Sequence, residues 1–99
     1  MVDFEDLKNT FCFQGKIIGF NQVLNKSKAL HKIKKLKIKQ AKYIYIYFVV
    51  NPNMFLLDLC EIINKVEKNC NEEVKIIWDY ELNEFYKNKF KMCLLAVGI

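Results

Sequence analysis

The sequence predicts an α+β fold, in which a mixed four-stranded β-sheet packs with two to three helices. Segment 43–50 alternates aromatic and β-branched residues, and segment 90–97 ends on a continuous apolar run. Both patterns are typical of strands, the second of a strand buried on both faces. Segments 26–36 and 54–68 instead place apolar residues at helical spacing. Strands and helices that alternate along one short chain favour a single sheet with helices packed on it.

Length and composition set the limits. The 99 residues, of which 53% are hydrophobic and 14% aromatic, are enough for one domain, 1–99, with its own core. The cysteines form no Cys-x-x-Cys pair and there is a single histidine, so the sequence predicts no metal site and no cofactor. We expect Cys12, Cys60, Cys70 and Cys93 to be reduced thiols of a cytoplasmic protein.

The first part of the chain predicts a helix followed by a strand. Asp3 can cap a helix over 3–13, with Asp6 in its first turn, and Gly15 ends this helix. A strand follows over 16–23, where apolar residues surround one glycine.

The middle of the chain predicts a helix over 26–36, capped by Asn25 or Ser27, and a strand over 43–50. The apolar stripe of the helix contains Ala29, Leu30, Ile33 and Leu36. One face of the strand contains Ile44, Ile46, Phe48 and Val50, and the other Tyr43, Tyr45, Tyr47 and Val49. Since neither face is polar, we expect a central strand covered on both sides. This apolar run is far shorter than the roughly 20 residues of a transmembrane helix.

The last part predicts a helix over 54–68, capped by Asn53, and strands over 74–82 and 90–97. The inward stripe of this helix contains Phe55, Leu59, Ile62, Ile63 and Val66. Trp78 is expected to pack in the core. The predicted order is therefore helix, strand, helix, strand, helix, strand, strand.

Charge is distributed unevenly along the chain. The net charge is +5, all sixteen cations are lysine, and segment 26–42 holds eight of them, with His31 and no acid. Lys32, Lys34, Lys35, Lys37 and Lys39 form a possible basic interaction surface for an acidic partner or an anionic membrane surface, although a lysine run is also typical of a solvated helix face. The absence of arginine argues against sequence-specific nucleic-acid binding. His31 is expected at the surface.

Two stretches resemble one family, the bacterial tubulin-like division GTPase FtsZ. The opening segment 2–6, Val-Asp-Phe-Glu-Asp, resembles its synergy loop, in which an apolar residue, Asp, two variable residues and Asp follow an asparagine. Segments 76–78 and 94–99, Ile-Ile-Trp and Leu-Leu-Ala-Val-Gly-Ile, resemble the closing hairpin of the C-terminal domain. The order and spacing of these pieces cover essentially the whole chain.

The resemblance implies an FtsZ C-terminal-like domain in which Asp3 and Asp6 reach the nucleotide site of a neighbouring subunit. Carboxylates there orient the water that attacks the γ-phosphate. The same two residues also suit a helix cap and a first-turn acid. Departures from the family are clear. Met1 stands at the loop asparagine, Val50-Asn51-Pro52 replaces a glycine pair, and the three glycines form no phosphate-binding loop.

Two hypotheses follow from the resemblance. In the first, the chain is a protein-interaction module of cell division or tubulin-like filament assembly, which binds FtsZ or another tubulin-like GTPase and does not bind GTP itself. In the second, it is a self-associating module, or a fragment or split half of a larger tubulin-like GTPase. An independent enzyme is disfavoured, because no nucleophile–base constellation stands out.

Overall fold

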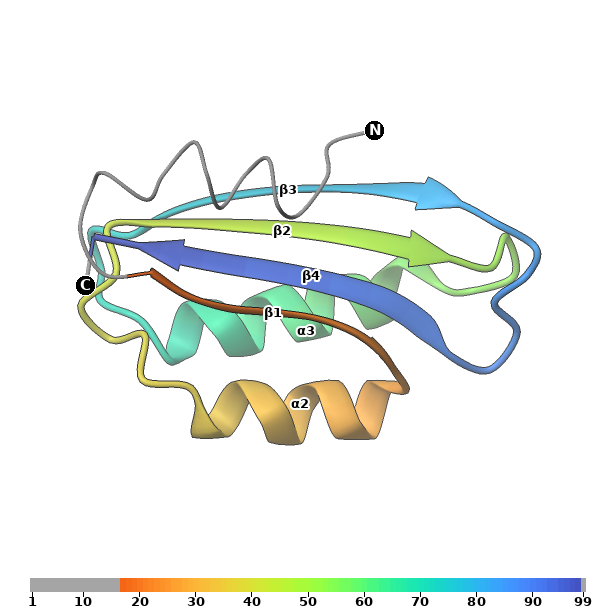
Figure 1. Cartoon of the computed structure of the whole chain (residues 1–99), viewed down its shortest axis with the longest axis horizontal. Helices are drawn as coiled ribbons and strands as arrows, with labels where there is room; N and C mark the ends of the chain where they lie inside the picture. The colour runs from red at the N-terminus through yellow and green to blue at the C-terminus, as the bar shows by residue number, and fades with distance from the viewer. Residues whose placement is uncertain (1–16, 99) are drawn as a thin grey trace.

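A computed structural model describes residues 17–98, and the predicted helix 3–13 lies outside this part. The elements are β1 (Ile17–Leu24), α2 (Lys26–Lys35), β2 (Tyr43–Val50), α3 (Leu56–Lys68), β3 (Lys75–Leu82) and β4 (Phe90–Val97). The strands form one sheet in the order β1-β4-β2-β3, and both helices lie on the same face of it (Figure 1). The predicted α+β fold with a mixed four-stranded sheet is confirmed.

The sheet is built around β2, as its apolar sequence predicts. β2 pairs antiparallel with β4 and parallel with β3, with Ile46 opposite both Leu94 and Trp78. Ile44, Ile46 and Phe48 are at most 1% exposed and pack in one cluster with residues of both helices. Burial of these side chains stabilises the fold through the hydrophobic effect.

The closing hairpin that we expected between the last two strands is wrong. β3 and β4 are not neighbours, because β2 lies between them. Helix α3 carries the chain back along the sheet, so that β3 runs parallel to β2, as in a strand–helix–strand unit. The loop after β3 then crosses β2, and β4 pairs between β1 and β2.

Helix α2 begins and packs as predicted. The Asn25 side chain accepts a hydrogen bond from the Lys28 backbone N–H at 2.8 Å, which caps the first turn. Ala29 and Ile33 are fully buried against the sheet and α3. Three lysines lie in the last turn, where positive charge favours the negative end of the helix dipole.

Helix α3 begins later than predicted, and Asn53 is not its cap. Asn51 Oδ1 accepts the Asn53 N–H at 2.9 Å, and the Asn51 carbonyl accepts the Met54 N–H at 2.9 Å. These bonds hold the chain in a turn, so the helix starts only after Phe55, which provides no side-chain cap. Phe55 is 74% exposed, so its predicted inward position is also wrong.

The second face of the sheet is only partly covered. On β4, Leu95 and Val97 are almost completely buried, in agreement with the expectation for that strand. On β2, Val49 is buried but Tyr43 is 44% exposed, so the expected complete cover holds for only part of the strand. On the opposite face, which the helices cover, Trp78 packs edge-to-face on Phe48 yet is 37% exposed, because β3 is an edge strand. Within 17–98, no helix combines the length and the apolarity needed to cross a membrane.

Candidate functional site

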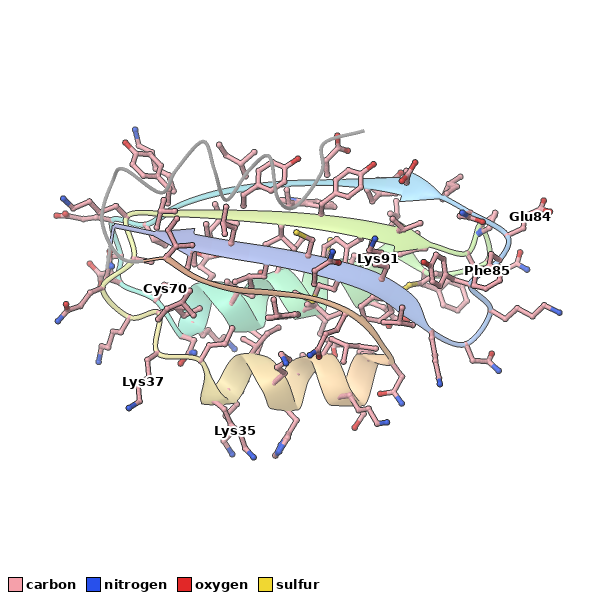
Figure 2. All side chains as sticks on the ribbon, in the orientation of Figure 1. Lys35, Lys37, Cys70, Glu84, Phe85 and Lys91 are labelled. Atoms are coloured by element: carbon pink, nitrogen blue, oxygen red, sulfur yellow. The ribbon has the colours of Figure 1, made fainter. Side chains whose placement is uncertain are left out.

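The basic surface is the candidate site within the described residues, since Asp3 and Asp6 lie outside them. It consists of Lys32, Lys34 and Lys35 in the last turn of α2 and of Lys37 and Lys39 in the loop that leads to β2. The last four are exposed, and Lys35 and Lys37 point away from the body of the molecule (Figure 2). His31 is exposed as well, as predicted.

Lys32 differs from the other four lysines because its amine is engaged within the chain. Its Nζ donates a hydrogen bond to Gln22 Oε1 at 2.9 Å and lies 4.8 Å from the centre of the Phe20 ring. A cation over an aromatic face is a favourable contact. Lys32 therefore fastens α2 to β1, and the other four lysines form the part of the basic surface that is open to a partner.

The loop that carries Lys37 and Lys39 is held from inside. Ile38 and Ala41 are fully buried, so the loop alternates apolar anchors with exposed lysines. The Asn71 amide donates hydrogen bonds to the Lys39 carbonyl at 2.7 Å and to the Ala41 carbonyl at 3.0 Å. The loop backbone is thereby fixed, which reduces the entropy that a partner must overcome to order it.

A second asparagine fixes the end of α2. The Asn69 amide donates hydrogen bonds to the carbonyls of Ile33 and Leu36, at 2.9 and 3.0 Å. The last carbonyls of a helix otherwise have no donor within the helix. The α3–β3 loop, from which both asparagines come, thus holds the segment that carries the basic surface.

Beside this loop lies an open depression of about 630 Å³. It is lined by Lys39, Gln40, Ala41, Lys42, Tyr43, Asn71, Glu73 and Lys75. Three of these side chains are amines and one is a carboxylate, so the depression favours anionic groups such as carboxylates and phosphates.

Lys42 and Lys75 are not among the site residues that the sequence predicted. Lys42 directly precedes β2 and Lys75 begins β3, and the two parallel strands start in register, with Tyr43 opposite Lys75. The pairing of these strands could have revealed this neighbourhood, but the sequence suggested a hairpin of β3 with β4 instead.

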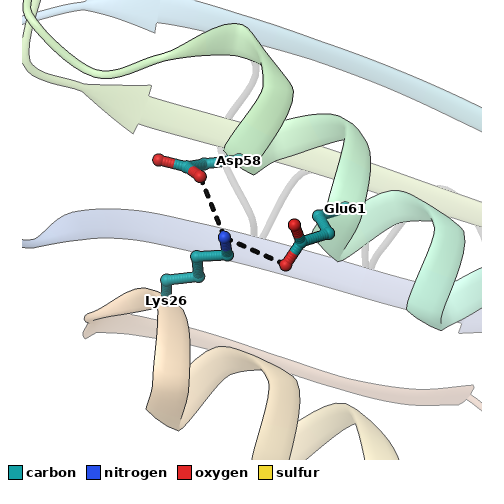
Figure 3. A network of polar contacts seen from close by, with 3 residues as sticks. All are labelled: Lys26, Asp58 and Glu61. Atoms are coloured by element: carbon teal, nitrogen blue, oxygen red, sulfur yellow. Dashed lines mark hydrogen bonds and ion pairs between the residues drawn. The ribbon is translucent and has the colours of Figure 1, made fainter.

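Like Lys32, Lys26 has its amine engaged within the chain. Lys26 Nζ lies 2.9 Å from both Asp58 Oδ1 and Glu61 Oε2 (Figure 3), and so joins the start of α2 to the first half of α3. The hydrogen bond to Asp58, followed by that to Glu61, raises the pKa of the Lys26 amine above its usual value. Lys26 is therefore tied to α3 and does not belong to the basic surface.

Side chains of the types that bind metals or act as nucleophiles also occur within the described residues. No group of three or more His, Cys, Asp or Glu residues within 17–98 is placed to hold a metal ion. Burial, followed by the nearby Glu67 carboxylate, raises the pKa of the Cys70 thiol to about 11. Cys70 is thus protonated near neutral pH and is a poor nucleophile.

Comparison with known proteins agrees with this description of the fold. No family model and no curated protein matches the sequence. FtsZ of M. jannaschii, solved as an empty dimer, matches with a TM-score of 0.69 at 19% identity, over 99% of this chain and 31% of that one. A tryptophan-to-tyrosine mutant of that FtsZ matches with a TM-score of 0.70 at 18% identity, over 100% of this chain and 32% of the mutant chain. TubZ of Bacillus thuringiensis serovar israelensis, solved as GDP-form protofilaments, matches with a TM-score of 0.61 at 8% identity, over 83% of this chain and 25% of the TubZ chain.

The chain therefore spans about a third of the length of the FtsZ structures that it matches. At these identities the likeness is one of fold. The resemblance to the FtsZ C-terminal domain, which the sequence suggested, is confirmed at the level of the fold.

Proposed function

We propose that this chain is a protein-interaction module that binds FtsZ or another tubulin-like GTPase polymer and does not bind GTP by itself. The observation that carries the proposal is the match of the whole chain to about a third of FtsZ. A domain with the shape of one part of a subunit can occupy the position of that part against a neighbouring subunit.

Two features support a contact with a filament. The matched FtsZ was solved as a dimer and the matched TubZ as protofilaments, so this fold occurs in subunits that associate with copies of themselves. Asp3 and Asp6, which correspond by motif to the synergy-loop acids, would enter the nucleotide site of the FtsZ subunit at a filament end. By itself the chain is not an enzyme, and at most it supplies these two carboxylates to a composite site.

The basic surface provides a second contact in this proposal. Lys34, Lys35, Lys37 and Lys39 are exposed at one end of the domain. Lysines in such a position steer the approach of an acidic protein surface and raise the association rate, and added salt weakens this effect. Tubulin-like filaments, a cytoplasmic location and a role in cell division are the setting that the resemblance implies.

Light scattering of purified FtsZ during GTP-driven assembly tests the proposal. Addition of this chain in molar excess is expected to change the plateau or the rate of assembly, because a bound domain offers no site for the next subunit. The Asp3→Asn/Asp6→Asn double variant should lose this effect on assembly. A matched control is Glu72→Gln/Glu84→Gln, which removes two exposed carboxylates elsewhere. Assembly curves that coincide with and without excess chain would overturn the proposal.

A second candidate is a split half of a larger tubulin-like GTPase, which the coverage of 31% to 32% of FtsZ also favours. In that case the chain would bind a separately encoded domain that carries the phosphate loop, and GTPase activity would appear only in the mixture. Hydrolysis measured for each part and for the mixture separates the two candidates.

A further inference from the structure

β3 is a long edge strand with apolar side chains exposed on both faces. It lies at one end of the strand order and along one edge of the sheet in Figure 1. Trp78, Tyr80 and Leu82, on the helix side, are 37%, 37% and 58% exposed, and Ile77, on the other side, is 59% exposed. Edge strands of this kind readily pair with another strand unless something blocks them.

The outer edge of β3 presents the backbone groups of its even-numbered residues. The Lys75 N–H donates to the Lys42 carbonyl and the Asn83 N–H to the Val50 carbonyl, so the odd-numbered residues bond toward β2. Backbone groups alternate in direction along a strand, and those of Ile76, Trp78 and Tyr80 therefore point outward. Within the described residues, no strand pairs with this edge.

We propose that a second copy of this chain pairs with β3, so that two β3 strands run antiparallel about a two-fold axis and the two sheets form one continuous eight-stranded sheet. A two-fold axis perpendicular to the sheet leaves each face on its own side, so the helices of both copies cover the same face. The contact is self-complementary, as closed homodimers require.

Charge selects one register for this pairing. With Trp78 opposite its symmetry mate, Lys75 of each copy lies opposite Glu81 of the other, and Ile76 lies opposite Tyr80. A shift by one symmetric step in one direction would place Asp79 opposite Asp79. A shift in the other direction would place Lys75 opposite Asp79 and Ile77 opposite Ile77, but it would shorten the pairing to residues 75–79 of β3. Like charges directly opposite one another destabilise a strand pair and opposite charges stabilise it. The proposed register has two opposite-charge pairs and no like-charge pair within β3, and it allows residues 75–81 of both copies to pair.

The same register accounts for the exposed apolar groups. Trp78 and Tyr80 stack with ring centres 6.3 Å apart. Trp78 would lie opposite Trp78 of the mate, and Tyr80 opposite the mate's Ile76. The Tyr80 N–H, which now donates to Asp79 Oδ1 at 2.7 Å, would donate to the Ile76 carbonyl of the mate instead. Charges on an edge strand usually prevent pairing, but here their signs match the partner strand in reverse order.

Sedimentation equilibrium of the full chain over a wide concentration range tests the dimer without any other protein. The wild-type chain is expected to dimerise. Lys75→Glu and Glu81→Lys should each weaken the dimer about tenfold, because each turns two attractive pairs into repulsive ones. The combined Lys75→Glu/Glu81→Lys variant should restore the dissociation constant to within about threefold. Lys28→Glu, an equal charge change at an exposed position of α2, is the control.

Ile77 gives a second test that does not depend on the first. Ile77 is exposed, so charged substitutions there are compatible with folding, and in the proposed register it lies opposite Asp79 of the mate. Ile77→Lys should tighten the dimer and Ile77→Glu should weaken it. A wild-type chain that stays monomeric at the highest soluble concentration would overturn the inference, as would a dimer that is indifferent to the sign of the charge at residue 77. Since FtsZ takes no part, failure here leaves the proposed function untouched.

Discussion

At the scale of single residues, Asn69 and Asn71 of the α3–β3 loop fix the backbone of the segment that carries the basic surface. Their amides supply four hydrogen bonds to backbone carbonyls of α2 and of the loop after it. The sequence did not predict this role of Asn69 and Asn71, because a side-chain bond to residues about 30 positions away leaves no local pattern. The basic surface could be predicted from the run of lysines in the sequence. The hydrogen bonds from Asn69 and Asn71 that hold its backbone could not.

Replacement of Asn71 tests this support. Asn71→Ala removes the donor from the exposed bond to the Lys39 carbonyl and from the partly buried bond to the Ala41 carbonyl, so the free energy of unfolding should fall by about 1–3 kcal/mol. Asn71→Asp keeps the acceptor that binds the Glu73 N–H but places a carboxylate against the two carbonyls, and it should cost at least as much. Urea unfolding measures both. Asn88→Ala, at an exposed site, is the control, and equal losses for Asn71→Ala and Asn88→Ala would contradict the account.

Cys70 offers a test at the same scale through its raised pKa, about 11. Alkylation by iodoacetamide at pH 8 should be about tenfold slower in the folded chain than in urea, since a shift of two units in thiolate fraction is partly offset by higher nucleophilicity. The rate in the folded chain should keep rising with pH toward 11. Mass spectrometry of the Cys70 peptide provides the readout. Equal rates in the folded and unfolded chains would show that burial does not protect this thiol.

The raised pKa of Cys70 also predicts the direction in which the free energy of unfolding changes with pH. The folded state raises the pKa of the thiol, so it favours the neutral form. The contribution of Cys70 to stability is therefore complete below the unfolded pKa of about 9 and declines as the pH rises toward 11. Cys70→Ser should reduce this part of the alkaline decline in the free energy of unfolding.

For the elements, what the sequence could predict depended on local pattern. β1, α2, β2 and β4 were predicted to within a residue or two, because their periodicity and caps are local. The start of α3 was missed because Asn51 and Pro52 form a turn whose bonds compete with a cap at Asn53. The position of β3 was missed because the neighbours of a strand depend on tertiary pairing.

A glycine in β1 tests the packing of two strands. A Cβ at Gly19 would fall on the Leu94 carbonyl oxygen and within 3.3 Å of Leu95 Cα. Because backbone must then move, Gly19→Ala should lower the free energy of unfolding by about 1–3 kcal/mol. Asn21→Ala, at an exposed site two residues along the same strand, should stay within about 0.5 kcal/mol. Thermal or urea unfolding decides, and a neutral Gly19→Ala would mean that β1 and β4 lie further apart than described.

For the whole molecule, the fold gathers positive charge at one end of the domain. The end of α2, the loop after it and the starts of β2 and β3 meet there, and Lys39, Lys42 and Lys75 line one depression. The other end carries exposed apolar residues such as Phe55 and Phe85. A domain polarised in this way approaches an acidic surface in a preferred orientation.

The basic end leads to a prediction about binding. Lys34→Glu/Lys35→Glu/Lys37→Glu should slow association with a tubulin-like polymer at least about tenfold at low salt and much less at high salt, because screening removes steering. Lys28→Glu/Lys87→Glu/Lys89→Glu, with the same change in net charge at exposed positions away from that end, is the control. Stopped-flow mixing at several salt concentrations gives the rates. Equal effects of the two triple variants would assign the result to net charge rather than to the basic surface.

Co-sedimentation with FtsZ polymer tests the central claim most directly. Purified FtsZ is assembled with GTP in the presence of this chain, and the pellet is assayed for both proteins. The account predicts that the chain enters the pellet only when GTP is present, well below one copy per FtsZ subunit if it binds filament ends, and that the polymer mass changes as more chain is added. A chain that stays in the supernatant at molar excess while polymer mass is unchanged would contradict the account.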